Sequence, residues 1–328
     1  MTVTPAYQRH QVAVPQGTLT VGCWGRGPIK VFASHGITAN HRSFALVAEA
    51  IDRQSAGAVS LVALDHRGRA GSAHVGAPFG LTSHADDLVA VMDAFNVEQA
   101  TLVGHSMGGF VIANAAERHP DRVASLTLID GGLPFPPSGW SEGDSIVVDR
   151  ALSDDADAAT IEAAIHAVIG PALARLDMRW PDIDSYVRFF RDHPAFQPPN
   201  CWTATAEGYV RYDAVVTDEG EIRSSVNKDA VLVDGAAAIV DPNAAAALTR
   251  ITTPSHLLWC PRGLLDQQPG LYPPGFADAM ANAWPHLRVQ QVEGTNHYTV
   301  VTSAEGAEVV AAAVLSGRPG GQRAPDLG

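Results

Sequence analysis

The chain is short of cysteine and of positive charge, and both shortages exclude classes of protein. Its 328 residues include three cysteines, which stand far apart at positions 23, 201 and 260. An odd number at wide spacing fits neither a disulfide framework nor a zinc site, and it favours a reducing, cytoplasmic location. Lysine and arginine number 22 against 35 acidic residues, so the net charge is −13. A nucleic-acid partner is therefore not expected, because such partners bind basic surfaces.

Long apolar runs, a leader sequence and phosphate or metal motifs are also missing. The sequence has no run of about 18 apolar residues, so no membrane-spanning helix is predicted. The start, MTVTPAYQRHQVAV, lacks the basic and then apolar order of a signal peptide. Neither G-x-x-x-x-G-K-[ST] nor H-E-x-x-H occurs. We therefore expect no cofactor, no metal and a small molecule as partner, and the sequence leaves the oligomeric state open.

An alternation of apolar strands with amphipathic helices is what the chain does contain. This order is typical of a mostly parallel sheet that helices cover on both faces. The pattern predicts a helix over 83–96, SHADDLVAVMDAFN, with Ser83 as its N-terminal cap. The predicted strands are 7–14 and 18–24, joined as a hairpin, followed by 29–36, 59–64, 100–103, 123–130, 254–260 and 287–294.

The alternation breaks between Leu133 and Arg250. This stretch contains many aromatic residues and two helix candidates, 157–170 and 181–194. It predicts a helical lid over 133–250, inserted into a core formed by 1–132 and 251–316. The tail over 317–328, GRPGGQRAPDLG, is predicted to be disordered.

The pattern G-x-S-x-G occurs twice, around Ser106 and around Ser141. It has a mechanical meaning only where a strand turns sharply into a helix and exposes the serine hydroxyl. The apolar run 100–103 precedes Ser106, and a helical pattern follows it. Before Ser141 stands LPFPPSG, whose prolines argue against a central strand. Ser106 is therefore the candidate nucleophile.

Four segments in this order resemble the α/β-hydrolase family across nearly the whole chain. They are His35-Gly36 after the third strand, DHRGRAGS after the fourth, GHSMGG at the serine turn and EGTNHYT after the last strand. The resemblance implies an eight-stranded sheet with a lid inserted after the sixth strand. It also implies a catalytic triad of serine, acid and histidine.

The chemistry of such a triad assigns a role to each candidate residue. A serine hydroxyl is a poor nucleophile near neutral pH and needs a neighbouring base. His297 follows the last predicted strand and is the candidate base for Ser106. The tetrahedral intermediate needs preorganised donors; the backbone N–H of Met107 is one, and the resemblance adds that of Ile37. We interpret His105 as packing, with its side chain leaving the strand end away from the site.

The acid of the triad is open between two aspartates. Most family members place it three residues past the seventh strand, but that position here is Gly263. Asp266 is the acid in that loop, which is longer than the family pattern. Asp130 ends the sixth strand, a position that some branches of the family use. We favour Asp266, because its loop follows the usual strand.

These residues predict a serine hydrolase that cleaves an ester or lactone of a small hydrophobic molecule. Hydrolysis of a carbon–carbon bond in a diketone uses the same triad and remains open, as do thioester and amide cleavage. A non-catalytic binding protein on the same fold is the alternative from another class. Dehalogenation and epoxide opening are not expected, because those branches carry aspartate where this chain has Ser106.

Overall fold

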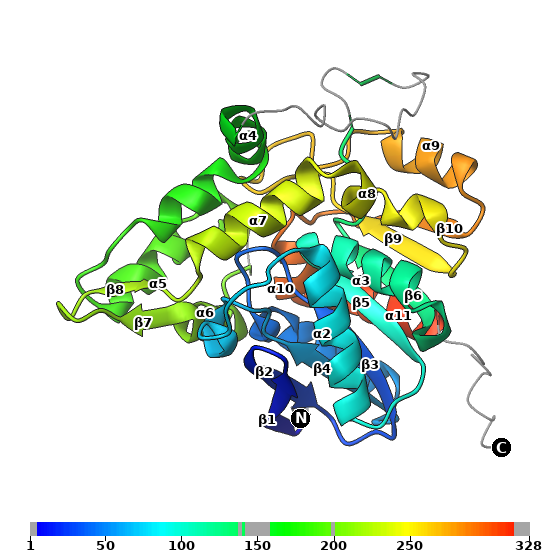
Figure 1. Ribbon diagram of the computed structural model, residues 1–328, viewed down its shortest axis with the longest axis horizontal. Helices are drawn as coiled ribbons and strands as arrows, with labels where there is room; N and C mark the ends of the chain where they lie inside the picture. Colours follow the sequence, from blue (N-terminus) through cyan, green and yellow to red (C-terminus); the bar gives the residue numbers. More distant parts are fainter. Residues whose placement is uncertain (1–4, 137–139, 142–157, 198–200, 318–328) are drawn as a thin grey trace.

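An eight-stranded sheet forms the centre of the protein in the computed structural model, which describes residues 5–136, 140–141, 158–197 and 201–317 (Figure 1). The strand order is β1-β2-β4-β3-β5-β6-β9-β10. The hairpin of β1 and β2 is antiparallel, β2 pairs antiparallel with β4, and the remaining pairs are parallel. The bounds are β1 Tyr7–Val14, β2 Gly17–Trp24, β3 Ile29–Ser34, β4 Val59–Leu64, β5 Ala100–His105, β6 Val123–Ile129, β9 Ser255–Trp259 and β10 Leu287–Gln291.

Every strand expected from the alternation is present, and the mostly parallel α/β architecture is confirmed. Strands β4 and β5 are buried along their whole length, since helices cover both faces of the sheet. One face packs on α2 Leu81–Ala94, α3 Met107–Arg118 and α9 Phe276–Ala283. The other packs on α1 Ala45–Gln54, α10 Thr299–Thr302 and α11 Ala304–Ser316.

The predicted start of the helix over 83–96 is wrong by two residues. Helix α2 begins at Leu81, and Gly80 precedes it with φ 108°, so Ser83 lies within the first turn. No side chain caps this end of the helix. The N–H of Gly80, the residue before the helix, donates to Asp234 Oδ1 at 2.6 Å. This bond fixes the entry to the helix, and because its partner is 154 residues away a local pattern could not predict it.

The insertion follows the sixth strand, as expected, and most of it, from α4 and α7 to α5, α6 and the hairpin, lies on the left of Figure 1. Besides helices it contains the hairpin of β7 Ala214–Val216 and β8 Ile222–Ser224, which the sequence did not predict. Its helices and turns are α4 Ala158–Leu176, α5 Ile183–Arg191, η4 Pro194–Phe196, α6 Ala204–Asp213, α7 Lys228–Ile239, α8 Pro242–Ala245 and η5 Ala247–Arg250.

Helix α4 continues beyond its predicted end and is bent. It runs through Pro171, and Ile169 leaves the helical conformation at φ −124°. A proline inside a helix removes one hydrogen bond and clashes with the preceding turn, which accounts for the kink. Within the described residues, Ala159–Leu176 is long and apolar enough to cross a membrane, by length and composition alone. Its buried residues Ile165 and Leu173 pack into the cluster that lies over α3.

The predicted tail lies outside the described residues from position 318 onward. The division into a core of 1–132 and 251–316 and a lid of 133–250 stays a prediction about independent units.

Candidate active site

Ser106 occupies a strained turn between β5 and α3. Its φ is 55° and its ψ is −123°, values that a residue with a side chain rarely adopts. The neighbouring glycines make the turn sterically possible. A Cβ on Gly104 would lie 2.2 Å from the Gly108 carbonyl oxygen, and one on Gly108 would lie 1.9 Å from that of Ser34. This is the strand–turn–helix geometry that lifts a serine above the edge of a sheet.

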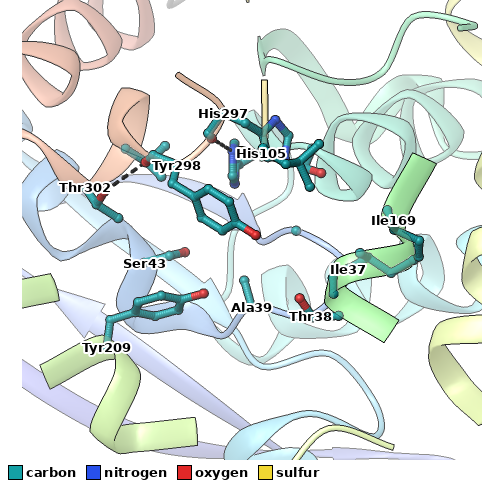
Figure 2. Close-up of a pocket in the computed structure, with 15 residues that line it drawn as sticks. Ile37, Thr38, Ala39, Ser43, His105, Ile169, Tyr209, His297, Tyr298 and Thr302 are labelled. Atoms are coloured by element: carbon teal, nitrogen blue, oxygen red, sulfur yellow. Dashed lines mark hydrogen bonds between the residues drawn. The ribbon is translucent and has the colours of Figure 1, made fainter. Parts of the chain in front are cut away.

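Two small cavities meet at Ser106 and His297. The front cavity, drawn in Figure 2, has a volume of about 40 Å³ and lies against residues 36–39, which follow β3. The rear cavity, of about 30 Å³, lies against Met107 and Phe110 of α3. The insertion closes both: Ile169 lines the two cavities, Tyr209 the front one, and Ala238 and Ile239 the rear one. The inserted layer therefore covers the serine.

His297 is bound to Asp130. The distance from His297 Nδ1 to Asp130 Oδ2 is 2.7 Å, and both side chains are buried. The other carboxylate oxygen of Asp130 accepts the Cys260 N–H at 3.0 Å. A carboxylate accepts hydrogen bonds, so the Nδ1 of His297 carries the proton and its Nε2 is left as the basic nitrogen.

This geometry contradicts the preference for Asp266. Its Oδ1 accepts from Asn296 Nδ2 at 2.8 Å and lies 3.1 Å from Arg262 Nε, so the carboxylate is held beside His297 but not against its ring. The longer loop carries Asp266 to the residue before the histidine. Asp130 reaches the ring because its backbone turns to a positive φ of 43° at the end of β6.

Among the described residues, the Ser106 hydroxyl has no hydrogen-bond partner. Ser106 and His297 nevertheless line the same two cavities. Contacts between a nucleophile and its base are often longer in the absence of substrate. The arrangement can therefore pass a proton from the Ser106 hydroxyl to the His297 imidazole, which Asp130 orients.

The two candidate oxyanion donors flank the same serine. Met107 begins α3, and the first amides of a helix have no acceptor within it. Ile37 lies in the loop after β3, where a Cβ on Gly36 would lie 3.2 Å from that of Ser106. The Ile37 carbonyl accepts from Arg69 Nε at 3.0 Å, which fixes this loop from behind.

Arg69 is fully buried and joins the core to the insertion. Its NH2 group lies 2.5 Å from Asp234 Oδ2 on α7. That carboxylate also accepts from His84 Nε2, at 2.9 Å. Burial tends to raise the pKa of Asp234, but His84 and Arg69 outweigh it and hold that pKa well below its usual value. The loop that carries Ile37 is thus anchored to a charge in the inserted layer.

His105 does not point away from the site, contrary to expectation. Its Nε2 donates to the His297 carbonyl oxygen at 2.8 Å, and the two rings lie 4.8 Å apart (Figure 2). Burial lowers the pKa of His105 to about 3, so the ring is neutral near neutral pH. Its packing role stands, but what it supports is the backbone of His297.

Asn296 is a residue of the site that the sequence reasoning missed. It is completely buried, and its Oδ1 accepts the N–H groups of Tyr298 and Thr299 at 3.0 and 2.9 Å. Its Nδ2 donates to Asp266 and, at 2.9 Å, to the Ala195 carbonyl of the insertion. The signal was its position directly before the candidate base, within TNH. Asn296 holds that loop against the inserted layer.

The second serine pattern falls largely outside the described residues, since Gly139, Glu142 and Gly143 are not among them. Ser141 itself is exposed and lies in neither a strand nor a helix. It lines neither cavity at His297.

Comparison with known proteins agrees with this geometry. A family model of the alpha/beta hydrolase fold matches residues 31–156. The solved structure of E-2-(acetamidomethylene)succinate hydrolase superposes with a TM-score of 0.68 over 95% of this chain and 98% of the other, at 20% identity. The chain therefore has the α/β-hydrolase fold, and its residues 31–156 match the model of that family.

Two curated relatives are similar over shorter stretches. The 2-(acetamidomethylene)succinate hydrolase of Mesorhizobium japonicum is 33% identical over 121 residues, 37% of this chain and 41% of the relative. The 2-hydroxymuconate semialdehyde hydrolase of Pseudomonas sp. strain CF600 is 48% identical over 75 residues, 21% of this chain and 26% of the relative. The matches thus span less than half the length of either relative. Both are hydrolases by name, of different substrates.

Proposed function

We propose that this chain is a serine hydrolase that cleaves an ester or lactone of a small hydrophobic molecule. The observation that carries the proposal is the pairing of His297 with Asp130 at 2.7 Å beside the cavities that contain Ser106. The strained turn at Ser106 supports it, because strain of this kind is concentrated at functional residues. The hydrolases among the relatives support the general activity.

In the proposed reaction, His297 Nε2 takes the proton of Ser106 as the oxygen attacks the substrate carbonyl carbon. Asp130 keeps the proton on Nδ1 and stabilises the imidazolium that forms. The N–H groups of Met107 and Ile37 donate to the carbonyl oxygen as it becomes negative. Collapse of the tetrahedral intermediate breaks the bond to the leaving alcohol, which receives the proton from His297.

Water then completes the cycle. His297 takes a proton from the water molecule, which attacks the carbonyl carbon of the acyl-enzyme. The second intermediate releases the acid and returns the proton to Ser106. The insertion covers the site and excludes bulk water, which strengthens the electrostatic interactions of these groups. For this role we call the insertion a lid.

A fluorophosphonate probe tests the proposal directly. The reagent phosphonylates an activated serine, and peptide mapping should place the label on Ser106. Ser141→Ala should label as fully as the parent chain and hydrolyse a p-nitrophenyl ester at an unchanged rate. A chain that neither reacts with the probe nor hydrolyses any ester or lactone is a binding protein on this fold, and the proposal is then wrong.

Cleavage of a carbon–carbon bond is the second candidate. The similarity to 2-hydroxymuconate semialdehyde hydrolase favours it, since that match is 48% identical where it exists. Both reactions would label Ser106, so the probe does not separate them. A screen that includes vinylogous diketones beside esters and lactones does, through the ratio of kcat/KM between the two classes.

A further inference from the structure

A third cavity, larger than the other two, adjoins the front cavity. This outer cavity has a volume of about 220 Å³, against about 40 and 30 Å³ for the two at Ser106. It shares Ala172, Leu264 and Tyr298 with the front cavity, so these three side chains form the partition between them. In Figure 2 the Tyr298 ring reaches into the front cavity from the side of His297. Space for the larger part of a substrate therefore lies beyond Tyr298.

The outer cavity is apolar and belongs mostly to the insertion. Helix α4 contributes one side and α5 with η4 the other, and Leu264 and Leu265 come from the loop after β9. Its aromatic and aliphatic side chains are Pro171, Met178, Phe189, Phe190, Phe196, Leu264 and Leu265. Apolar walls of this kind bind a ligand by removing apolar surface from water.

One charged side chain, Arg175, lines the outer cavity, and its charge is neutralised. Its NH1 group lies 3.2 Å from Asp213 Oδ2 and donates to the Tyr186 hydroxyl. The guanidinium also lies over the Phe190 ring, at 5.0 Å from its centre. The hydroxyls of Ser224 and Ser225 each donate to Asp213 at 2.8 Å. Because Arg175 is paired with Asp213, the pair presents no net charge to a ligand.

The other titratable groups of this wall, His193 and Tyr298, are neutral as well. Burial raises the pKa of the Tyr298 hydroxyl, so it keeps its proton near neutral pH. His193 Nδ1 accepts the Ala195 N–H at 3.2 Å. Burial, and then the neighbouring charge of Arg175, lower the pKa of His193, so it is uncharged near neutral pH. Among the described residues that line the front and rear cavities there is no lysine or arginine. A carboxylate on the substrate would thus find no free cation along this path.

We propose that the outer cavity binds the tail of the substrate, and that this tail is an uncharged apolar chain of medium length. The inference rests on the proposed ester hydrolysis at Ser106 and names its substrate class. The front cavity holds only a short group, so a longer chain on the reacting ester passes Tyr298 and Leu264. The absence of an unpaired cation separates this substrate from a succinate, which the similar structure's name specifies.

Four matched esters test the inference. Ethyl octanoate should have a kcat/KM at least about tenfold above that of ethyl acetate, because each methylene buried in an apolar pocket adds to binding. It should exceed monoethyl suberate by a similar factor, since the suberate has the same length with a carboxylate at its end. Octyl acetate, an isomer of ethyl octanoate, shows whether the chain enters from the alcohol side instead of the acyl side. All rates are measured by titration of released acid.

Blocking variants locate the tail. Ala174 and Ala167 are both exposed residues of α4, but Ala174 lines the outer cavity and Ala167 lines none of the three cavities. Ala174→Trp should lower the ratio of octanoate to acetate kcat/KM about tenfold, and Ala167→Trp should leave it unchanged. Met178→Trp fills the cavity from another position and serves if Ala174→Trp does not fold, as thermal melting will show.

The outcomes distinguish this inference from the proposed function. Normal fluorophosphonate labelling with no dependence on chain length, or equal ratios in Ala174→Trp and Ala167→Trp, overturns the tail site and leaves the serine hydrolase in place. A preference for monoethyl suberate over ethyl octanoate overturns the uncharged tail. Absence of both labelling and ester hydrolysis overturns the proposed function, and the tail site with it.

Discussion

Replacing Asp130 with asparagine should disable the proposed base through its tautomer. The Cys260 N–H donates to Asp130 Oδ1, and that donor needs an acceptor in the variant too. The amide oxygen of the new side chain must therefore face Cys260, and its NH2 group faces His297 Nδ1. The imidazole then accepts at Nδ1 and carries its proton on Nε2. That nitrogen can no longer take a proton from Ser106.

The size of the effect follows from this loss of the base. Removal of the charge from a triad acid lowers kcat by roughly 10⁴-fold, which corresponds to about 5 kcal/mol of transition-state stabilisation. Asp266→Asn is the matched control, with the same change of atoms. The Asp266 side chain is 24% exposed and pairs with Arg262, which is 30% exposed. A partly exposed pair at the rim of the site contributes about 1 kcal/mol, so kcat should fall by less than about fivefold.

The assay is kcat for a p-nitrophenyl ester, with active-site titration and thermal melting of each variant. The role of Asp130 is refuted if Asp266→Asn loses as much activity as Asp130→Asn while both variants remain folded. It is also refuted if Asp130→Asn retains a tenth or more of the parent rate.

Three further outcomes are expected. Ser106→Ala should lower kcat by roughly 10⁴ to 10⁶-fold with an unchanged melting temperature, and an active folded variant would contradict its role. Gly108→Ala should prevent stable folding, since its Cβ would lie 1.9 Å from a backbone oxygen, whereas Gly208→Ala has no atom within 4 Å and should fold; equal melting temperatures would be the contrary result. Burial lowers the pKa of His35 and of His105 to about 3 from 6.5, so the unfolded chain binds more protons and stability is lost as the pH falls. Between pH 6.5 and pH 5 the free energy of unfolding should drop by about 3 kcal/mol, measured by urea denaturation, and an unchanged midpoint would contradict this.

The sheet and the turn at Ser106 could be predicted because their signals are local. Apolar runs define the strands, and the glycines around Ser106 are required by contacts within a few residues or with the adjacent strand. The choice between Asp130 and Asp266 could not be made in this way. It depends on a left-handed backbone at Asp130 and on the path of a long loop, and neither has a periodic signal. The clue was Asp130-Gly131-Gly132: a Cβ on Gly131 would lie 2.2 Å from the Ser106 carbonyl oxygen.

The sequence predicts the insertion only as a break in the alternation of strands and helices. Its contacts could not be predicted, because they join residues far apart in the chain. Asn296 illustrates the limit. Its hydrogen bonds to Ala195 and Asp266 span 101 and 30 residues. The sequence around TNH therefore gives no sign that Asn296 connects two distant segments. Aromatic composition indicated an apolar layer, but not that Arg175 would be neutralised within it by Asp213.

The pairing of Arg69 with Asp234 restricts how this protein can be re-engineered. Engineering by domain exchange replaces an insertion and keeps the core. Here the core carries a buried cation, and its counter-ion belongs to the insertion. A foreign insertion without a carboxylate at the position of Asp234 would leave the buried guanidinium of Arg69 unpaired. It would also loosen the loop of Ile37, because the same guanidinium donates to the Ile37 carbonyl. A chimera that replaces α7 should therefore also replace Arg69, so that the cation and its counter-ion are exchanged together.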